Sequence, residues 1–153
     1  GILLEKDIKP SAKKIALERS FVDEKGNAID VDSLPSGSTF YLKLTLTNAD
    51  KIVIVDNVAI TQNLPSGWEI ENTRLNNDKL PDFVRNGNIA YTDIRDDKIM
   101  WFLNYYGANE SMFVKINTIT PGNYLLPPAN AEAMYDNSFL ANTESRAVSV
   151  TSP

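Results

Sequence analysis

The chain has 153 residues, of which 42% are hydrophobic and 23% are charged, and its formal net charge is −5. These proportions are ordinary for a globular protein, so we expect one folded domain over residues 1–153. The acidic balance argues against nucleic-acid binding, because phosphate recognition needs a clustered basic surface. No apolar run approaches the roughly 20 residues of a membrane-spanning helix, so we expect no direct membrane insertion by this domain.

The sequence contains neither cysteine nor histidine. Their absence removes disulfides, thiolate nucleophiles, histidine acid–base chemistry and nearly all zinc or copper sites. A catalyst would have to be built from serine, lysine and carboxylates alone, so we expect no enzyme, no metal and no cofactor. The chain starts with Gly1 rather than methionine, and we therefore expect a fragment of a longer protein.

Alternating hydrophobicity predicts β-strands along most of the chain. Phe40, Leu42, Leu44 and Leu46, for example, alternate with polar or half-polar residues, the period of a strand with one buried face. The predicted strands cover residues 15–21, 40–47, 51–60, 98–106, 112–119, 123–127 and 146–150.

Turn sequences rich in glycine, proline and asparagine separate these strands. Residues 107–111 have the length of a hairpin connection between two of them. The best helix candidate is short, at residues 80–85, with Pro81 in its first turn. Short strands, regular turns and at most one short helix predict an all-β fold, an antiparallel immunoglobulin-like β-sandwich.

Three carboxylates, Asp93, Asp96 and Asp97, gather around Arg95. Such a group can bind calcium or support acid–base catalysis. It lacks the Asp/Asn/Gly loop of an EF-hand, however, and Arg95 offers an internal ion partner. We favour a turn whose aspartates accept hydrogen bonds from backbone N–H groups.

Two further patterns suggest chemistry. Ser11 and Lys14 have the Ser-x-x-Lys spacing of penicillin-recognising enzymes, but the companion motifs SDN and KTG are missing and the residues lead into a strand. Trp68 and Trp101 can line a sugar-binding face, which leaves an adhesin or carbohydrate-binding module as the alternative function. Strand aromatics lie more often in the core, so the exposure of the two tryptophans decides between these interpretations.

The segment PPANAEAMYD, residues 127–136, suits neither an ordinary core strand nor a helix. Pro127 and Pro128 argue against a strand, and the run is too short for a stable helix. It ends in the bulky pair Met134 and Tyr135, which we expect at the tip of a stiff loop.

Three segments resemble the bacterial alpha-2-macroglobulin family. The resemblance lies in its C-terminal macroglobulin-like domain, MG10, the counterpart of the receptor-binding domain of the animal proteins, and covers residues 15–150 in the same order and spacing. Two departures are Asn137-Ser138 in place of Pro-Glu and Lys98 in place of arginine. The matching segments are NLPSGWEIEN (63–72, family "LPaGfEien"), DIRDDKIMWFLNY (93–105, family "yRDDRv…ff") and VKINTITPGNYLLPPANAEAMYD (114–136, family "vRavtpGtFvlPPvqAEaMYdP").

The resemblance implies a much larger parent protein that traps proteases. In this family a protease cuts a bait region, the molecule rearranges, and an internal Cys–Gln thioester captures the attacker. This chain has no cysteine and so does not carry the thioester. The implied partners are the thioester domain and neighbouring macroglobulin-like domains of the parent, and target proteases through the parent. The implied location is the periplasm or cell envelope, with a lipid-anchored parent.

Met134 and Tyr135 are the candidate site residues within this family. We expect them to shield the thioester until bait cleavage, because tyrosine offers a large apolar ring with a polar tip and methionine a pliable filler. The alternative is that both pack into the core or lower edge of their own domain. The shield hypothesis predicts that both side chains are more exposed than their hydrophobicity warrants.

Overall fold

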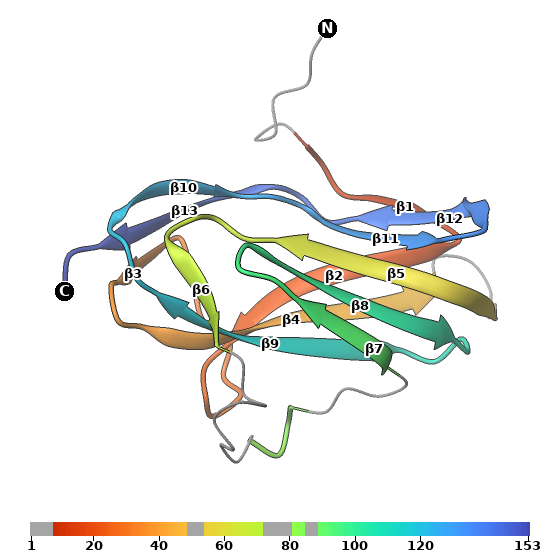
Figure 1. Ribbon diagram of the computed structural model, residues 1–153, viewed down its shortest axis with the longest axis horizontal. Helices are drawn as coiled ribbons and strands as arrows, with labels where there is room; N and C mark the ends of the chain where they lie inside the picture. Colours follow the sequence, from red (N-terminus) through yellow and green to blue (C-terminus); the bar gives the residue numbers. More distant parts are fainter. Residues whose placement is uncertain (1–7, 49–53, 72–80, 85–88) are drawn as a thin grey trace, which may run out of the picture.

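The computed structural model describes residues 8–48, 54–71, 81–84 and 89–153 (Figure 1). These residues form strands, turns and irregular segments, and none of them is helical. No helix capable of crossing a membrane therefore occurs among them. The strands are β1 (Ser11–Lys13), β2 (Ile15–Val22), β3 (Ser33–Pro35), β4 (Thr39–Asn48), β5 (Val55–Asn63), β6 (Trp68–Glu71), β7 (Ile89–Ile94), β8 (Lys98–Tyr105), β9 (Glu110–Thr118), β10 (Gly122–Leu126), β11 (Ala129–Ala133), β12 (Asp136–Asn142) and β13 (Arg146–Thr151).

Ten of these strands form one folded-over antiparallel sheet in the order β6-β9-β4-β2-β1-β12-β11-β5-β8-β7. β1 is the joint, since it pairs with β12 along its length but with β2 only at Lys13 and Ile15. The two halves of the sheet face each other across the core (Figure 1). A second sheet, β10-β13-β3, covers the end of the molecule at which the chain terminates, and its β13–β3 pair is parallel. The predicted all-β immunoglobulin-like sandwich is confirmed.

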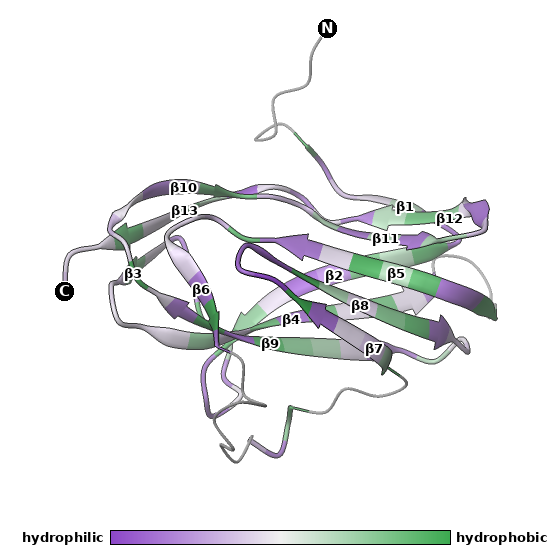
Figure 2. Ribbon diagram, in the orientation of Figure 1, coloured by the Kyte–Doolittle hydropathy of each residue, from purple (hydrophilic) through white to green (hydrophobic). Residues whose placement is uncertain are grey.

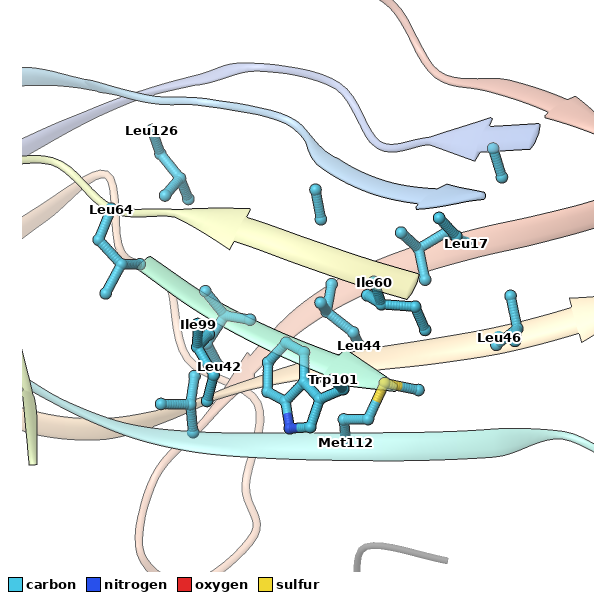
Figure 3. Close-up of a cluster of buried hydrophobic side chains, with 14 of the residues drawn as sticks. Leu17, Leu42, Leu44, Leu46, Ile60, Leu64, Ile99, Trp101, Met112 and Leu126 are labelled. Carbon is cyan, nitrogen blue, oxygen red and sulfur yellow. The ribbon is translucent and has the colours of Figure 1, made fainter. Parts of the chain in front are cut away.

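Alternating side chains of the long strands build the core. Leu42, Leu44 and Leu46 of β4 are fully buried, and every second residue of β8 is buried. Hydrophobic residues recur along the strands of both layers (Figure 2). Trp101 of β8 and Met112 of β9 lie together between the layers, close to Leu44 of β4 (Figure 3). Burying one such aliphatic side chain stabilises the fold by about 1.5–3 kcal/mol.

The predicted strand at residues 51–60 differs in its start. β5 begins at Val55, and residues 51–53 lie outside the described part of the chain. Ile54 precedes the strand with its side chain 69% exposed. Within the described residues, the expectation of a more fully buried strand is wrong at residues 54, 56 and 57, which are exposed.

The predicted helix at residues 80–85 is wrong over its described part. Pro81 to Val84 form a turn, in which the Val84 N–H donates to the Pro81 carbonyl at 3.0 Å. One such bond closes a turn without propagating into a helix. Leu80 and Arg85 lie outside the described residues.

The expectation that two prolines exclude a core strand from residues 127–136 is also wrong. β11 starts directly after them and lies in the middle of the large sheet, between β5 and β12. Because both prolines precede the first paired residue, neither has to supply a backbone N–H to the sheet. Ala129, Ala131 and Ala133 are at most 5% exposed and give β11 its core-facing side.

Candidate interaction site at the Met134–Tyr135 turn

Met134 and Tyr135 form the two-residue turn between β11 and β12. The paired residues Ala133 and Asp136 close it. The side chains of Met134 and Tyr135 are 51% and 82% exposed, and Tyr135 is the most exposed large hydrophobic residue among those described. The predicted exposure is confirmed, and packing of the pair into its own core is excluded.

The backbone of this turn departs from a regular hairpin. Two-residue hairpins favour turn types with positive φ, but neither Met134 nor Tyr135 has a positive φ. The register instead shifts in β12, where Glu132 pairs with Leu140, so that residues 137–139 have no partner in β11. Such extra residues bend a strand and re-aim its side chains.

The Asp136 carboxylate fixes the outgoing side of the turn. Its Oδ1 accepts hydrogen bonds from the Ser138 hydroxyl at 2.6 Å and from the Ser138 backbone N–H at 2.9 Å. Both bonds lower the pKa of Asp136 below its usual value, and the bond from the Ser138 hydroxyl has the larger effect. Ser138 is one of the residues that depart from the family pattern, and here it donates both hydrogen bonds that hold the Asp136 carboxylate.

A shallow hollow of about 300 Å³ lies beside Tyr135. Ile54 and Phe139 contribute to its apolar lining, and two aspartates also border it. We call Ile54, Tyr135 and Phe139 the Tyr135 face. Ile54 and Tyr135 are exposed and Phe139 is half-buried. Neighbouring exposed apolar residues are typical of interaction surfaces.

Sequence reasoning missed Ile54 and Phe139 as members of this face. Phe139 lies in β12, and Ile54 lies just before β5, so that Ile54 comes next to Tyr135 only through the pairing of β5 with β11. The one available signal was the polar pair Asp56–Asn57, which interrupts an otherwise apolar run and indicates an irregular strand.

Both tryptophans lie in the core. Trp68 is 3% and Trp101 is 0% exposed. Trp68 packs edge-on against Phe40 and Phe21, with ring centroids 5.1 and 6.2 Å apart. Neither tryptophan can therefore provide the aromatic platform of a carbohydrate-binding module.

Residues 95–97 form the predicted turn between β7 and β8, whereas Asp93 lies at the end of β7, and the bonding of Asp93 differs from the prediction. The Asp93 carboxylate accepts from Arg95 Nε and Nη2, each at 3.2 Å, rather than from backbone N–H groups. Asp96 and Asp97 are exposed. Within the described ranges, no three acidic residues are placed to hold a metal ion together.

Ser11 and Lys14 do not form a catalytic pair. The Ser11 hydroxyl donates to Asn142 Oδ1, whereas Lys14 Nζ donates to the Ser138 hydroxyl at 3.2 Å. Ser11 lies on β1 and Lys14 at the corner before β2, so they are not one helical turn apart. The prediction that this motif leads into a strand is confirmed.

Residues 15–137 match the family described as the Bacterial Alpha-2-macroglobulin MG10 domain. The chain belongs to this family. The MG10 domain is 25% identical over 114 residues to the alpha-2-macroglobulin of Xylella fastidiosa strain Temecula1, a match that covers 67% of the domain and 7% of that protein. The resemblance drawn from the sequence segments is thereby confirmed.

Two solved structures show the same fold. Salmonella alpha-2-macroglobulin reacted with methylamine matches the MG10 domain with a TM-score of 0.81 and 25% identity, over 94% of the domain and 10% of that chain. Trypsin-activated alpha-2-macroglobulin from Escherichia coli matches with a TM-score of 0.80 and 21% identity, over 94% of the domain and 11% of that chain. The MG10 domain thus spans about a tenth of the length of these relatives.

Proposed function

We propose that this MG10 domain docks on the thioester domain of its parent protein and that Met134 and Tyr135 shield the thioester until bait cleavage. The observation that carries the proposal is the Tyr135 side chain, 82% exposed at the tip of a hydrogen-bonded turn. A large apolar ring held out in water is explained if another domain covers it. Neighbouring macroglobulin-like domains of the parent complete the surroundings, and target proteases reach the domain only through the parent.

The chemistry of the pair suits this role. A thioester reacts with water and amines, so its persistence requires that both be excluded. The Tyr135 ring can cover the carbonyl while its hydroxyl remains hydrogen-bonded at the rim, and Met134 adapts to the remaining space. Burying an apolar side chain of this size contributes about 1.5–3 kcal/mol to docking, and a turn that is already ordered loses little entropy on binding.

The descriptions of the relatives support the proposal. The Salmonella protein was solved after reaction with methylamine, and the Escherichia coli protein after activation by trypsin. Amine reactivity and activation by a protease are the two properties that a shielded thioester trap requires. We extend them to the parent of this domain as part of the proposal.

Amine labelling of the parent protein tests the shield. We expect Tyr135→Ala to accelerate methylamine incorporation into the uncleaved parent by about tenfold or more, which corresponds to about 1.4 kcal/mol of lost protection. Tyr91→Ala is the matched control, because Tyr91 is another exposed tyrosine, 61% exposed on β7. An unchanged labelling rate in Tyr135→Ala, or a parent that takes up no methylamine, would refute the shield.

We also propose that the parent is a lipid-anchored protein of the periplasm or cell envelope. The support is the family resemblance, because a trap must stand where foreign proteases arrive. Cell fractionation and lipid labelling of the parent test this location. Recovery of an unlipidated parent in the cytosol would contradict it.

A further inference from the structure

A β-bulge in β5 lies beside the Met134–Tyr135 turn, because β5 pairs with β11 in the same sheet. β5 pairs with β8 through Val55 with Tyr105 and Val58 with Leu103, so that two residues of β5 face the single residue Asn104. A bulge of this kind bends its strand and changes the direction of the neighbouring side chains. The start of β5 and the end of β11 lie at the same end of the molecule (Figure 1).

Asn57 is the bulged residue that touches the turn. Its backbone carbonyl accepts a hydrogen bond from the Met134 N–H at 2.9 Å. Its own N–H donates to the side-chain Oδ1 of Asn104, also at 2.9 Å. A continuous chain of two hydrogen bonds therefore connects Asn104 to Asn57 and Asn57 to Met134.

The conformation of Asn57 makes this chain possible. Its φ is 55°, in the left-handed region that asparagine adopts more readily than other non-glycine residues. The left-handed residue turns its N–H toward Asn104 and its carbonyl toward Met134. Only one other described non-glycine residue, Lys14, has a positive φ, at 65°.

Lys14 contacts the outgoing strand of the same hairpin, β12, on the side away from β5. Its ammonium group donates to the Ser138 hydroxyl at 3.2 Å and lies 5.0 Å from the centre of the Phe139 ring. The two strained backbone positions thus both contact the hairpin that carries Met134 and Tyr135. Backbone strain of this kind persists where the surrounding structure maintains it, and it concentrates at functional sites.

We propose that Asn57 and Asn104 are positioning residues that fix the Met134–Tyr135 turn before any partner binds. The bulge anchors the Met134 amide to β5, and the carboxamide of Asn104 holds the bulge. This inference rests on the proposed function for its consequence, because pre-ordering of the turn matters for docking. Its geometry stands independently of that function.

Amide hydrogen exchange in this chain, measured by NMR, tests the geometry. Asn104→Leu removes the acceptor, and Asn104→Asp keeps an oxygen at the same place. We expect the Met134 amide to exchange about tenfold faster in Asn104→Leu, with little change in Asn104→Asp and at the core amide of Leu44.

The backbone requirement has its own pair of variants. Asn57→Val disfavours the left-handed conformation, whereas Asn57→Gly permits it. We expect faster Met134 exchange in Asn57→Val than in Asn57→Gly. Equal Met134 exchange in Asn104→Leu and Asn104→Asp overturns the positioning role, as does acceleration of Met134 and Leu44 to the same extent, which indicates global destabilisation.

Methylamine labelling of the parent separates this inference from the proposed function. We expect Asn104→Leu to accelerate labelling, but less than Tyr135→Ala does. If Tyr135→Ala accelerates labelling and Asn104→Leu leaves it unchanged, the positioning role fails and the shield stands. If neither variant changes labelling while Met134 exchange responds as predicted, the shield fails and the positioning of the turn stands.

Discussion

Arg19 of β2 donates a hydrogen bond from Nη1 to Oε1 of Gln62 in β5, 2.9 Å away, and so links the two layers of the sandwich. The same guanidinium donates to the carbonyls of Pro127 at 2.7 Å and Glu144 at 2.6 Å. Gln62, fully buried, also donates to the Pro127 carbonyl at 3.0 Å. Burial lowers the pKa of Arg19 to about 10, with the negative charge of Glu144 acting against that shift, so the group is still a cation at neutral pH.

Replacing Arg19 by methionine should destabilise the chain by about 2–4 kcal/mol, because the buried amide of Gln62 and the Pro127 carbonyl lose a charged donor. The free energy of unfolding in urea measures the loss. Arg19→Lys keeps the charge without the planar fork and should give an intermediate value. Arg95→Ala is the exposed control, with its side chain 60% exposed, and should cost less than about 1 kcal/mol. Equal effects of Arg19→Met and Arg95→Ala would contradict the inter-layer role.

An ion pair on β6 and β9 predicts how stability depends on pH. Lys115 Nζ lies 2.8 Å from Glu71 Oε2, and the hydrogen bond lowers the pKa of Glu71 and raises that of Lys115. A lowered carboxyl pKa contributes stability that is present above the unfolded pKa and lost as pH falls through the folded pKa. A raised lysine pKa contributes stability that is present below the unfolded pKa and lost as pH rises through the folded one.

Glu71→Gln should therefore reduce stability at neutral pH by less than about 1 kcal/mol, since the pair is only partly shielded from water. The difference in stability between Glu71→Gln and the unsubstituted chain should narrow as pH falls below the ordinary glutamate pKa and through the lowered pKa of Glu71. Thermal unfolding between acidic and neutral pH measures it. Glu69→Gln, at an exposed neighbouring position, is the control; a Glu71→Gln difference that persists unchanged into acid would rule out this linkage.

Gly67 is predicted to be intolerant of a side chain. A Cβ at this position would lie 2.3 Å from Cε2 of the Tyr124 ring, and the Tyr124 hydroxyl is held by the Thr120 carbonyl at 2.8 Å. We expect Gly67→Ala to destabilise the chain by about 1–3 kcal/mol through overpacking. In a Tyr124→Ala background the same change should cost much less, and a double-mutant cycle measures the coupling. Additive effects of the two substitutions would exclude the clash.

The buried tryptophans predict the fluorescence of the chain and test the alternative function. Because Trp68 and Trp101 are at most 3% exposed, acrylamide should quench the native chain weakly and the urea-unfolded chain strongly. Oligosaccharides should leave the emission unchanged, since neither indole is available for stacking. Strong quenching in the native state, or a saturable response to a sugar, would contradict this prediction and support the alternative function of a carbohydrate-binding module.

Local patterns in the sequence were sufficient to predict the sandwich. The alternation in β4 and β8 reports burial directly, because successive side chains of a strand point to opposite faces. β11 gave no such signal, since its core-facing residues Ala129, Ala131 and Ala133 are small and follow two prolines. Its place in the sheet comes from pairing with β5 and β12, which no local pattern contains.

The candidate site was predictable only as a pair of residues. The family segment pointed to Met134 and Tyr135, and the shield hypothesis drawn from that resemblance predicted their exposure. The bulge at Asn57 and the position of Ile54 beside Tyr135 depend on strand register between distant parts of the chain. Register is a tertiary property, so the environment of the turn required the structure.

The exposure of Tyr135 finally predicts a separation between stability and function. In the native chain the ring is 82% exposed, so Tyr135→Ala removes little packing and should change the free energy of unfolding by less than about 0.5 kcal/mol. Ile60→Ala, at a fully buried position of β5, should cost about 2–5 kcal/mol in the same urea titration. A large exposed ring that adds nothing to the stability of its own domain is expected where that ring contacts another domain. A Tyr135→Ala loss approaching that of Ile60→Ala would instead make Tyr135 a structural residue and remove the basis for the shield.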